Sequence, residues 1–114
     1  MSASELEDIF AMQLDAVGLD GYVREYQAIP GRRFRFDFAF VSGRWQGKNL
    51  LIEINGGTFT RGGHSTGIGI RRDYTKQNLC QIAGYKLLTF DADMVKSGQA
   101  LEFTEKMLRG KESG

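Results

Sequence analysis

The sequence predicts an α/β fold in which helices cover a mixed sheet. An amphipathic helical pattern opens the chain, alternating strand patterns follow it, and helical and strand patterns then take turns to the end. The 114 residues, 41% of them hydrophobic, suit a single domain over residues 1–114 with its own core. The expected element order is α-β-β-β-α-β-α.

The first helix is expected over residues 4–17, because apolar residues recur there at helical spacing. Ser4 and Glu7 fit a capping box at the start of this helix, and Gly18 suits its end. The residues of the apolar face are Leu6, Ile9, Phe10, Leu14 and Val17.

Three strands are expected next, over residues 22–27, 33–41 and 49–55, with a Pro30-Gly31 turn between the first two. In the second strand, phenylalanines alternate with two arginines, an aspartate and an alanine, so one face is aromatic and the other is charged. The aromatic face is expected to pack under helices. Its residues are Phe34, Phe36, Phe38 and Phe40.

The second half of the chain predicts two more helices around one more strand. A helix is expected over residues 70–83 and is ended by Gly84. A strand follows over residues 85–90, and Ser97 is placed to cap a last helix near 98–109.

Two acidic residues are expected to meet in the hairpin of the second and third strands. If Val41 pairs with Asn49, the register places Asp37 opposite Glu53. Carboxylates about 5 Å apart repel each other unless a proton, an arginine or a cation lies between them. Hard cations such as Mg²⁺ prefer oxygen ligands. The hairpin therefore favours a divalent-cation site; in the alternative, Asp37 pairs with a basic neighbour and Glu53 faces water.

Charge is unevenly distributed along the chain, although its formal net value is only +1. Residues 1–20 carry five acids and no Lys or Arg, whereas residues 21–76 carry ten Lys and Arg against four acids. The basic middle suits contact with a polyanion, and it equally suits a set of solvated surface cations. Its members are Arg24, Arg32, Arg33, Arg35, Arg44, Lys48, Arg61, Arg71, Arg72 and Lys76.

Other features of the composition restrict the class of protein. No apolar run approaches the roughly 20 residues of a membrane span, and the first residues do not fit a secretory signal, so no membrane partner is expected. The single cysteine, Cys80, excludes an internal disulfide and a cysteine-rich zinc site. These observations favour a cytoplasmic protein.

The order and spacing of several stretches resemble the PD-(D/E)XK nuclease superfamily, whose restriction-endonuclease-like core is αβββαβ. The similarity is greatest to small, phage-type members in the style of very-short-patch-repair and Holliday-junction-resolving nucleases. It implies a Mg²⁺-dependent DNA endonuclease, with Mn²⁺ as a substitute, that acts on duplex or branched DNA in phage or bacterial recombination, repair or processing. The matching stretches are S-E-L-E at 4–7, R-R-F-R-F-D-F at 32–38, L-I-E-I-N-G-G at 51–57, R-G-G-H-S-T-G-I-G at 61–69, D-Y-T-K-Q-N at 73–78 and G-Y-K-L-L-T-F at 84–90.

The resemblance assigns catalytic and metal-binding roles to particular residues. Asp37 and Glu53 match the two acids that hold the metal, with the Ile54 carbonyl as an extra ligand. Glu7 matches an acid that many members carry on the first helix. The alternative for Glu7 is a purely structural role in the capping box.

One catalytic position departs from the family pattern. The lysine expected two residues after Glu53 is Asn55, which is polar but is not a base. Related nucleases sometimes supply this lysine from the next helix, where Lys76 is the candidate. The alternative for Lys76 is an ordinary helix ion pair with Asp73.

Several residues are expected to contact DNA. Arg33 and Arg35 share the charged strand face with Asp37, and the glycine-rich segment 56–69 lets backbone N–H groups approach phosphate. Trp45 either stacks on a base or covers the apolar core. Because the chain is small, cutting both strands is expected to need a homodimer. The full predicted DNA-binding set is Arg33, Arg35, Arg61, His64, Arg71 and Arg72.

Two other functions fit the sequence. The absence of the motif lysine at Asn55 and the modest net charge also suit a noncatalytic nucleic-acid-binding module on the same fold. A small-molecule phosphate enzyme that uses the glycine-rich segment is the third hypothesis, and it predicts nucleotide binding that does not depend on Glu53.

Overall fold

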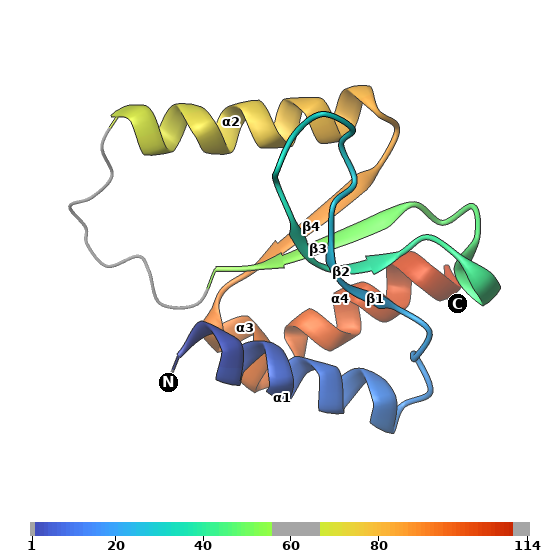
Figure 1. Cartoon of the computed structure of the whole chain (residues 1–114). Helices are drawn as coiled ribbons and strands as arrows, with labels where there is room; N and C mark the ends of the chain where they lie inside the picture. The colour runs from blue at the N-terminus through green and yellow to red at the C-terminus, as the bar shows by residue number, and fades with distance from the viewer. Residues whose placement is uncertain (1, 56–66, 111–114) are drawn as a thin grey trace.

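Helices and strands alternate around a single four-stranded sheet (Figure 1). The computed structural model describes residues 2–55 and 67–110, with residues 67–72 described by their backbone alone. The elements are α1 (Ala3–Ala16), β1 (Val23–Tyr26), β2 (Phe36–Phe40), the 3-10 turn η1 (Gly43–Trp45), β3 (Leu50–Ile54), α2 (Gly67–Ile82), β4 (Lys86–Phe90), α3 (Ala92–Ser97) and α4 (Gln99–Arg109).

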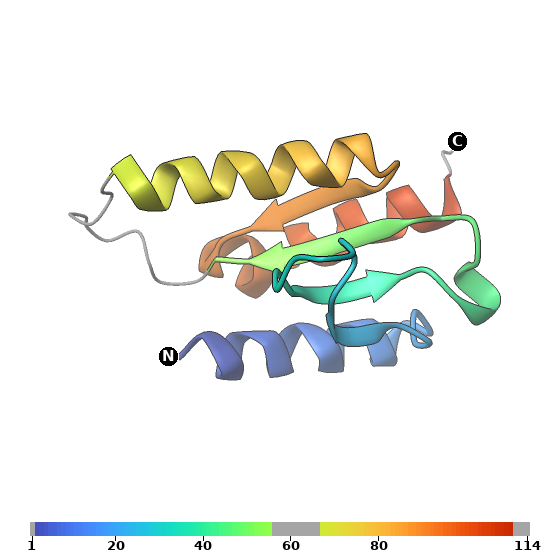
Figure 2. The ribbon, with the colours of Figure 1, turned by 45° about the horizontal axis from the view of Figure 1, so that its top comes forward.

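The sheet has the order β1-β2-β3-β4 and mixed direction. β2 is antiparallel to both of its neighbours, β1 and β3, and β4 is parallel to β3 after the α2 crossover. Helix α2 covers one face of the sheet, and α1 lies on the other face with α3 and α4 (Figure 2). The predicted α/β class and mixed sheet are therefore confirmed, with α3 as an addition to the expected order.

The predicted hairpin register is confirmed. Phe38 pairs with Ile52, and Phe40 pairs with Leu50. Extended by one residue, this register places Asp37 across from Glu53. The two carboxylates therefore come from neighbouring strands at the end of the sheet where β3 and β4 stop.

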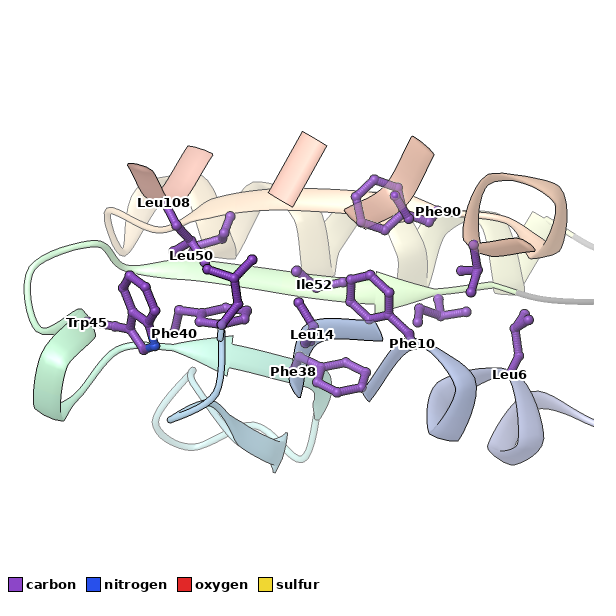
Figure 3. Packing of buried hydrophobic residues seen from close by; sticks show 14 residues of the cluster. Leu6, Phe10, Leu14, Phe38, Phe40, Trp45, Leu50, Ile52, Phe90 and Leu108 are labelled. Atoms are coloured by element: carbon purple, nitrogen blue, oxygen red, sulfur yellow. The ribbon is translucent and has the colours of Figure 1, made fainter. Parts of the chain in front are cut away.

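The core on the α1 face is built around aromatic side chains (Figure 3). Phe10 of α1 meets Phe38 edge-on at 5.2 Å between ring centroids, and Phe40 meets Trp45 in the same way at 5.7 Å. All four side chains are at most 5% exposed. Trp45 also donates from Nε1 to the Asp20 carbonyl at 2.7 Å, so it is a core residue and is not available to stack on a base.

The expectation of a single aromatic face on the second strand is wrong. Phe38 and Phe40 lie in the α1-side core, but Phe36 lies in the other core cluster, against α2. The expected strand is also too long, because Arg33 and Arg35 precede β2. Phe36 is the first residue of β2 and directly follows a loop that is hydrogen-bonded to α2 through the Arg35 carbonyl. Its ring therefore lies on the α2 side of the sheet, like that loop.

The start of α1 differs from its prediction. The Ser2 hydroxyl accepts from the Glu5 N–H at 3.2 Å, and the Glu5 carboxylate accepts from the Ser2 N–H at 2.7 Å. The predicted capping box of Ser4 and Glu7 is therefore wrong. Both registers match the S-x-x-E pattern, and the structure uses the earlier one. As a result, the Glu7 side chain is not a cap and contacts the sheet instead.

The C-terminal helices also begin differently. The Asp91 carboxylate caps the unexpected helix α3 by accepting from the Met94 N–H at 2.9 Å. Ser97 is the last residue of α3, and Gly98 is the N-cap of α4, but the Ser97 hydroxyl accepts from the N–H of Gln99, the first residue of α4, at 3.2 Å. Gly98, with φ of +90°, lies between the two helices, and this left-handed conformation suits glycine.

Candidate active site

Asp37 is fixed at the start of β2 by the backbone of β3. Its Oδ2 accepts from the Ile54 N–H at 2.7 Å, and its side chain is half-buried. Ile54 directly follows Glu53 on β3. The hydrogen bond therefore holds the Asp37 carboxylate against the backbone next to the second predicted acid. The Ile54 carbonyl stays a predicted metal ligand.

Glu53 binds a lysine from the facing helix. The Lys76 Nζ lies 2.5 Å from Glu53 Oε2, with side-chain exposures of 16% and 21%. The same ammonium donates to the Arg35 carbonyl at 2.9 Å and lies 4.6 Å from the centre of the Phe36 ring. The alternative ion pair with Asp73 does not form; Lys76 reaches the acid that the nuclease resemblance singled out.

Three carboxylates from three elements converge beside this pair. Glu7 of α1, Glu25 of β1 and Asp37 of β2 each offer an oxygen, and these oxygens lie within 4.8 Å of one another. Glu25 has a left-handed φ of +54°, which is uncommon for a residue with a side chain. Arg24 partly balances the charge, with its guanidinium 3.6 Å from Glu7.

Sequence reasoning missed Glu25. Pairs of β1 and β2 on either side of it place Glu25 across from Asp37. That register follows a long irregular loop, so no hairpin rule gives it from the sequence. The only available signal was an acid within a short strand pattern next to the Asp37 strand.

Burial and crowding raise the pKa values of the acids. Burial raises the pKa of Glu7 to about 7, and the carboxylates of Asp37 and Glu25 add to the rise. Burial also raises the pKa of Asp37, against the lowering effect of the Ile54 N–H. For Glu53, burial raises the pKa while the hydrogen bond and charge of Lys76 oppose the rise. The site therefore holds negative charge with difficulty and gains from a proton or a cation.

An open cleft of about 730 Å³ borders the Glu53–Lys76 pair. It lies beside the C-terminal ends of β3 and β4 and the middle of α2. Polar side chains with oxygen or nitrogen atoms dominate its wall, which suits a polar ligand. The lining residues are Glu53, Asn55, Asp73, Lys76, Gln77, Thr89 and Asp91.

The donor chemistry of the acidic trio fits a hard divalent cation. All three groups are carboxylates, which Mg²⁺ and Mn²⁺ accept as ligands, and the raised pKa values of Glu7 and Asp37 indicate that a cation would be stabilised there. Glu53 lies outside the trio, and its carboxylate binds Lys76 of α2. The expected sharing of one metal by Asp37 and Glu53 therefore stays a prediction.

The other predicted site residues fall into two groups. Asn55 is exposed at the cleft, and Arg33 and Arg35 are exposed in the loop before β2. The remaining predicted DNA contacts lie outside the described part of the chain, wholly or for their side chains. They are Arg61, His64, Arg71 and Arg72.

Comparisons with family models, with curated proteins and with solved structures found no significant match to this chain. No helix within the described residues is both long enough and apolar enough to cross a lipid bilayer.

Proposed function

We propose that this chain is a metal-dependent DNA endonuclease that hydrolyses phosphodiester bonds. The observation that carries the proposal is the convergence of Glu7, Asp37, Glu53 and Lys76, from four separate elements, at one end of the sheet. Carboxylates with raised pKa values beside a lysine and an open polar cleft are typical of a hydrolytic site.

The proposal includes the restriction-endonuclease-like core named by the sequence resemblance. Three antiparallel strands follow α1, and a crossover through α2 leads to a parallel fourth strand. This arrangement supports the assignment because it brings the start of β2 and the end of β3 to the same end of the sheet. Asp37 and Glu53 lie at that end.

Asp37 would hold the cation with Glu7 and Glu25, and Glu53 would join them once its carboxylate leaves Lys76. The bound Mg²⁺ would act as a Lewis acid on the phosphate and lower the pKa of water. The Ile54 N–H keeps the Asp37 carboxylate oriented by binding one of its two oxygens.

The protein side chains supply the remaining chemistry. The Lys76 ammonium also donates to the Arg35 carbonyl, which would keep it in place after Glu53 leaves, so that it can neutralise charge that develops on the phosphate. Glu7 would complete the ligand shell of the cation or hold a water molecule bound to it. Asn55, at the cleft, can donate a hydrogen bond but cannot replace a base.

A noncatalytic DNA-binding module is the second candidate function. The observation that favours it is the Glu53–Lys76 ion pair itself, because a carboxylate bound at 2.5 Å to an ammonium is not free to bind a metal. This candidate predicts DNA binding without cleavage under every metal condition.

The decisive experiment is a cleavage assay on supercoiled plasmid and on branched DNA with Mg²⁺ or Mn²⁺. Asp37→Asn and Glu53→Gln should abolish cutting and leave DNA binding largely intact. Glu102→Gln, which alters an exposed acid of α4, is the matched control and should cut like the wild type. Binding without cutting by the wild-type protein would replace the nuclease proposal with the second candidate. Gel filtration with and without DNA would test the predicted homodimer.

A further inference from the structure

The loop between β1 and β2 carries a concentration of positive charge. Residues 26–36 hold Arg32, Arg33 and Arg35 and no acid. All three arginines are exposed. Figure 1 shows this loop rising from the sheet to α2, on the side where Lys76 meets Glu53.

These arginines differ from the others whose side chains the structure describes. Arg24, Arg44 and Arg109 each form an ion pair with an acid. No ion pair within the described residues involves an arginine of the loop. The loop therefore presents three guanidinium groups that pair with no carboxylate in the part of the chain that the structure describes.

The loop is also held firmly at its base. Ala28 and Ile29 are buried in the α2-side core at 8% and 7% exposure. The Arg32 N–H donates to the Ile29 carbonyl at 3.1 Å and closes a turn through Pro30 and Gly31. Gly31 has φ of +81°, which the third position of such a turn requires. The arginines thus project from an ordered scaffold, which lowers the entropic cost of binding.

Lys76 links this loop to the acidic site. Its ammonium donates to the carbonyl of Arg35 and to the carboxylate of Glu53 at the same time. The loop arginines therefore stand at a fixed offset from the cleft, on the side of α2.

We infer that the loop of residues 27–35 is a docking surface for the phosphate backbone of DNA, with Arg32, Arg33 and Arg35 as its contacts. The inference rests on the proposed function for its choice of polyanion. The guanidinium groups bind phosphate oxygens beside the cleft and position the strand over the acidic cluster without reading its sequence.

The test is DNA binding in EDTA, measured by fluorescence anisotropy over a series of salt concentrations. The loop variant combines Arg32→Gln, Arg33→Gln and Arg35→Gln, which keep the backbone and its bond to Lys76. The control variant removes the same charge at exposed lysines elsewhere. It combines Lys48→Gln, Lys86→Gln and Lys96→Gln.

For duplex DNA, the slope of log affinity against log salt should fall by about 2–3 units in the loop variant, because each lost phosphate contact removes about 0.9. The control variant should keep the wild-type slope. Equal losses in the two variants, unchanged binding by the loop variant, or no DNA binding by the wild type would each overturn the inference. Circular dichroism of each variant identifies any loss of folding, and single substitutions then replace the triple one.

Plasmid cleavage in Mg²⁺, measured in parallel, separates this inference from the proposed function. If the wild type binds DNA through the loop but never cuts it, the docking-surface inference stands and the nuclease proposal is wrong. If the wild type cuts DNA and the loop variant binds and cuts as well as the wild type, the nuclease proposal stands and the docking-surface inference is wrong.

Discussion

The Lys76 ammonium and the Glu53 carboxylate meet 2.5 Å apart across the gap between α2 and β3, with only 16% and 21% of their side chains exposed. Such a pair is sensitive to the loss of either partner, because the remaining charge is left poorly solvated. It also connects the acidic cluster to the arginine loop through the Arg35 carbonyl.

Lys76→Met should abolish DNA cleavage and lower the free energy of unfolding by about 1–3 kcal/mol, because Glu53 loses a charged hydrogen-bond partner. Urea unfolding at pH 8 measures the change. The double variant Lys76→Met/Glu53→Gln should recover part of the loss, since no unpaired carboxylate remains. If the losses of stability in Lys76→Met and in Glu53→Gln instead add in full in the double variant, the ion pair does not couple these residues.

The stability of the fold should fall as pH rises through the range set by Glu7. Its folded-state pKa is about 7 and its ordinary value is 4.5, so the folded protein binds the Glu7 proton more tightly than the unfolded chain does. This stabilisation is fully present below about pH 4.5 and is lost as pH approaches 7. Asp37 and Glu53, whose pKa values are also raised, contribute in the same direction.

The check on this pH dependence is urea unfolding of the wild type and Glu7→Gln at pH 5 and pH 8. The wild type should lose more stability than Glu7→Gln between these two values. Glu102→Gln is the control and should behave like the wild type. Parallel pH profiles for the wild type and Glu7→Gln would contradict the raised pKa.

A divalent cation should stabilise the folded protein through Asp37. Millimolar Mg²⁺ or Mn²⁺ at pH 8 should raise the Tm of the wild type, since a ligand that binds only the folded state shifts unfolding by mass action. Asp37→Asn should lose this response, although the Asn carbonyl can still accept from the Ile54 N–H and preserve the fold. An equal rise in Tm for the wild type and Asp37→Asn would remove Asp37 from the metal site.

Trp45→Phe should lower stability and leave DNA binding unchanged. The variant keeps an aromatic ring against Phe40 but leaves the Asp20 carbonyl without its donor, at a cost of about 1–3 kcal/mol. Thermal unfolding and the anisotropy assay measure the two effects. A selective loss of DNA binding, with Tm intact, would restore the base-stacking role.

The sequence predicted the hairpin of β2 and β3 correctly because two apolar strands flank a short polar loop, and their pairing admits few registers. The positions of Asp37 and Glu53 across from each other could therefore be predicted from the sequence alone. Lys76 was named by its residue type and its place on the following helix, and its partner Glu53 is set by the packing of α2 on the sheet.

Other features depended on contacts that no local pattern encodes. Phe36 lies in the α2-side core, where the chain enters β2 from the loop tied to α2. Because both faces of the sheet are covered, alternation of phenylalanines does not identify a single buried face. Helix α3 has only six residues, too few for a periodic signal. Glu25 joined the acidic trio through a β1 register that follows an irregular loop.

The lone thiol of the chain lies beneath α2. Cys80 is fully buried in the α2-side core, and burial raises the pKa of its thiol. An alkylating reagent such as iodoacetamide attacks the thiolate and can reach it only when α2 separates from the sheet. The alkylation rate of the unmodified protein therefore reports how often the helix that carries Lys76 opens, without any engineered label.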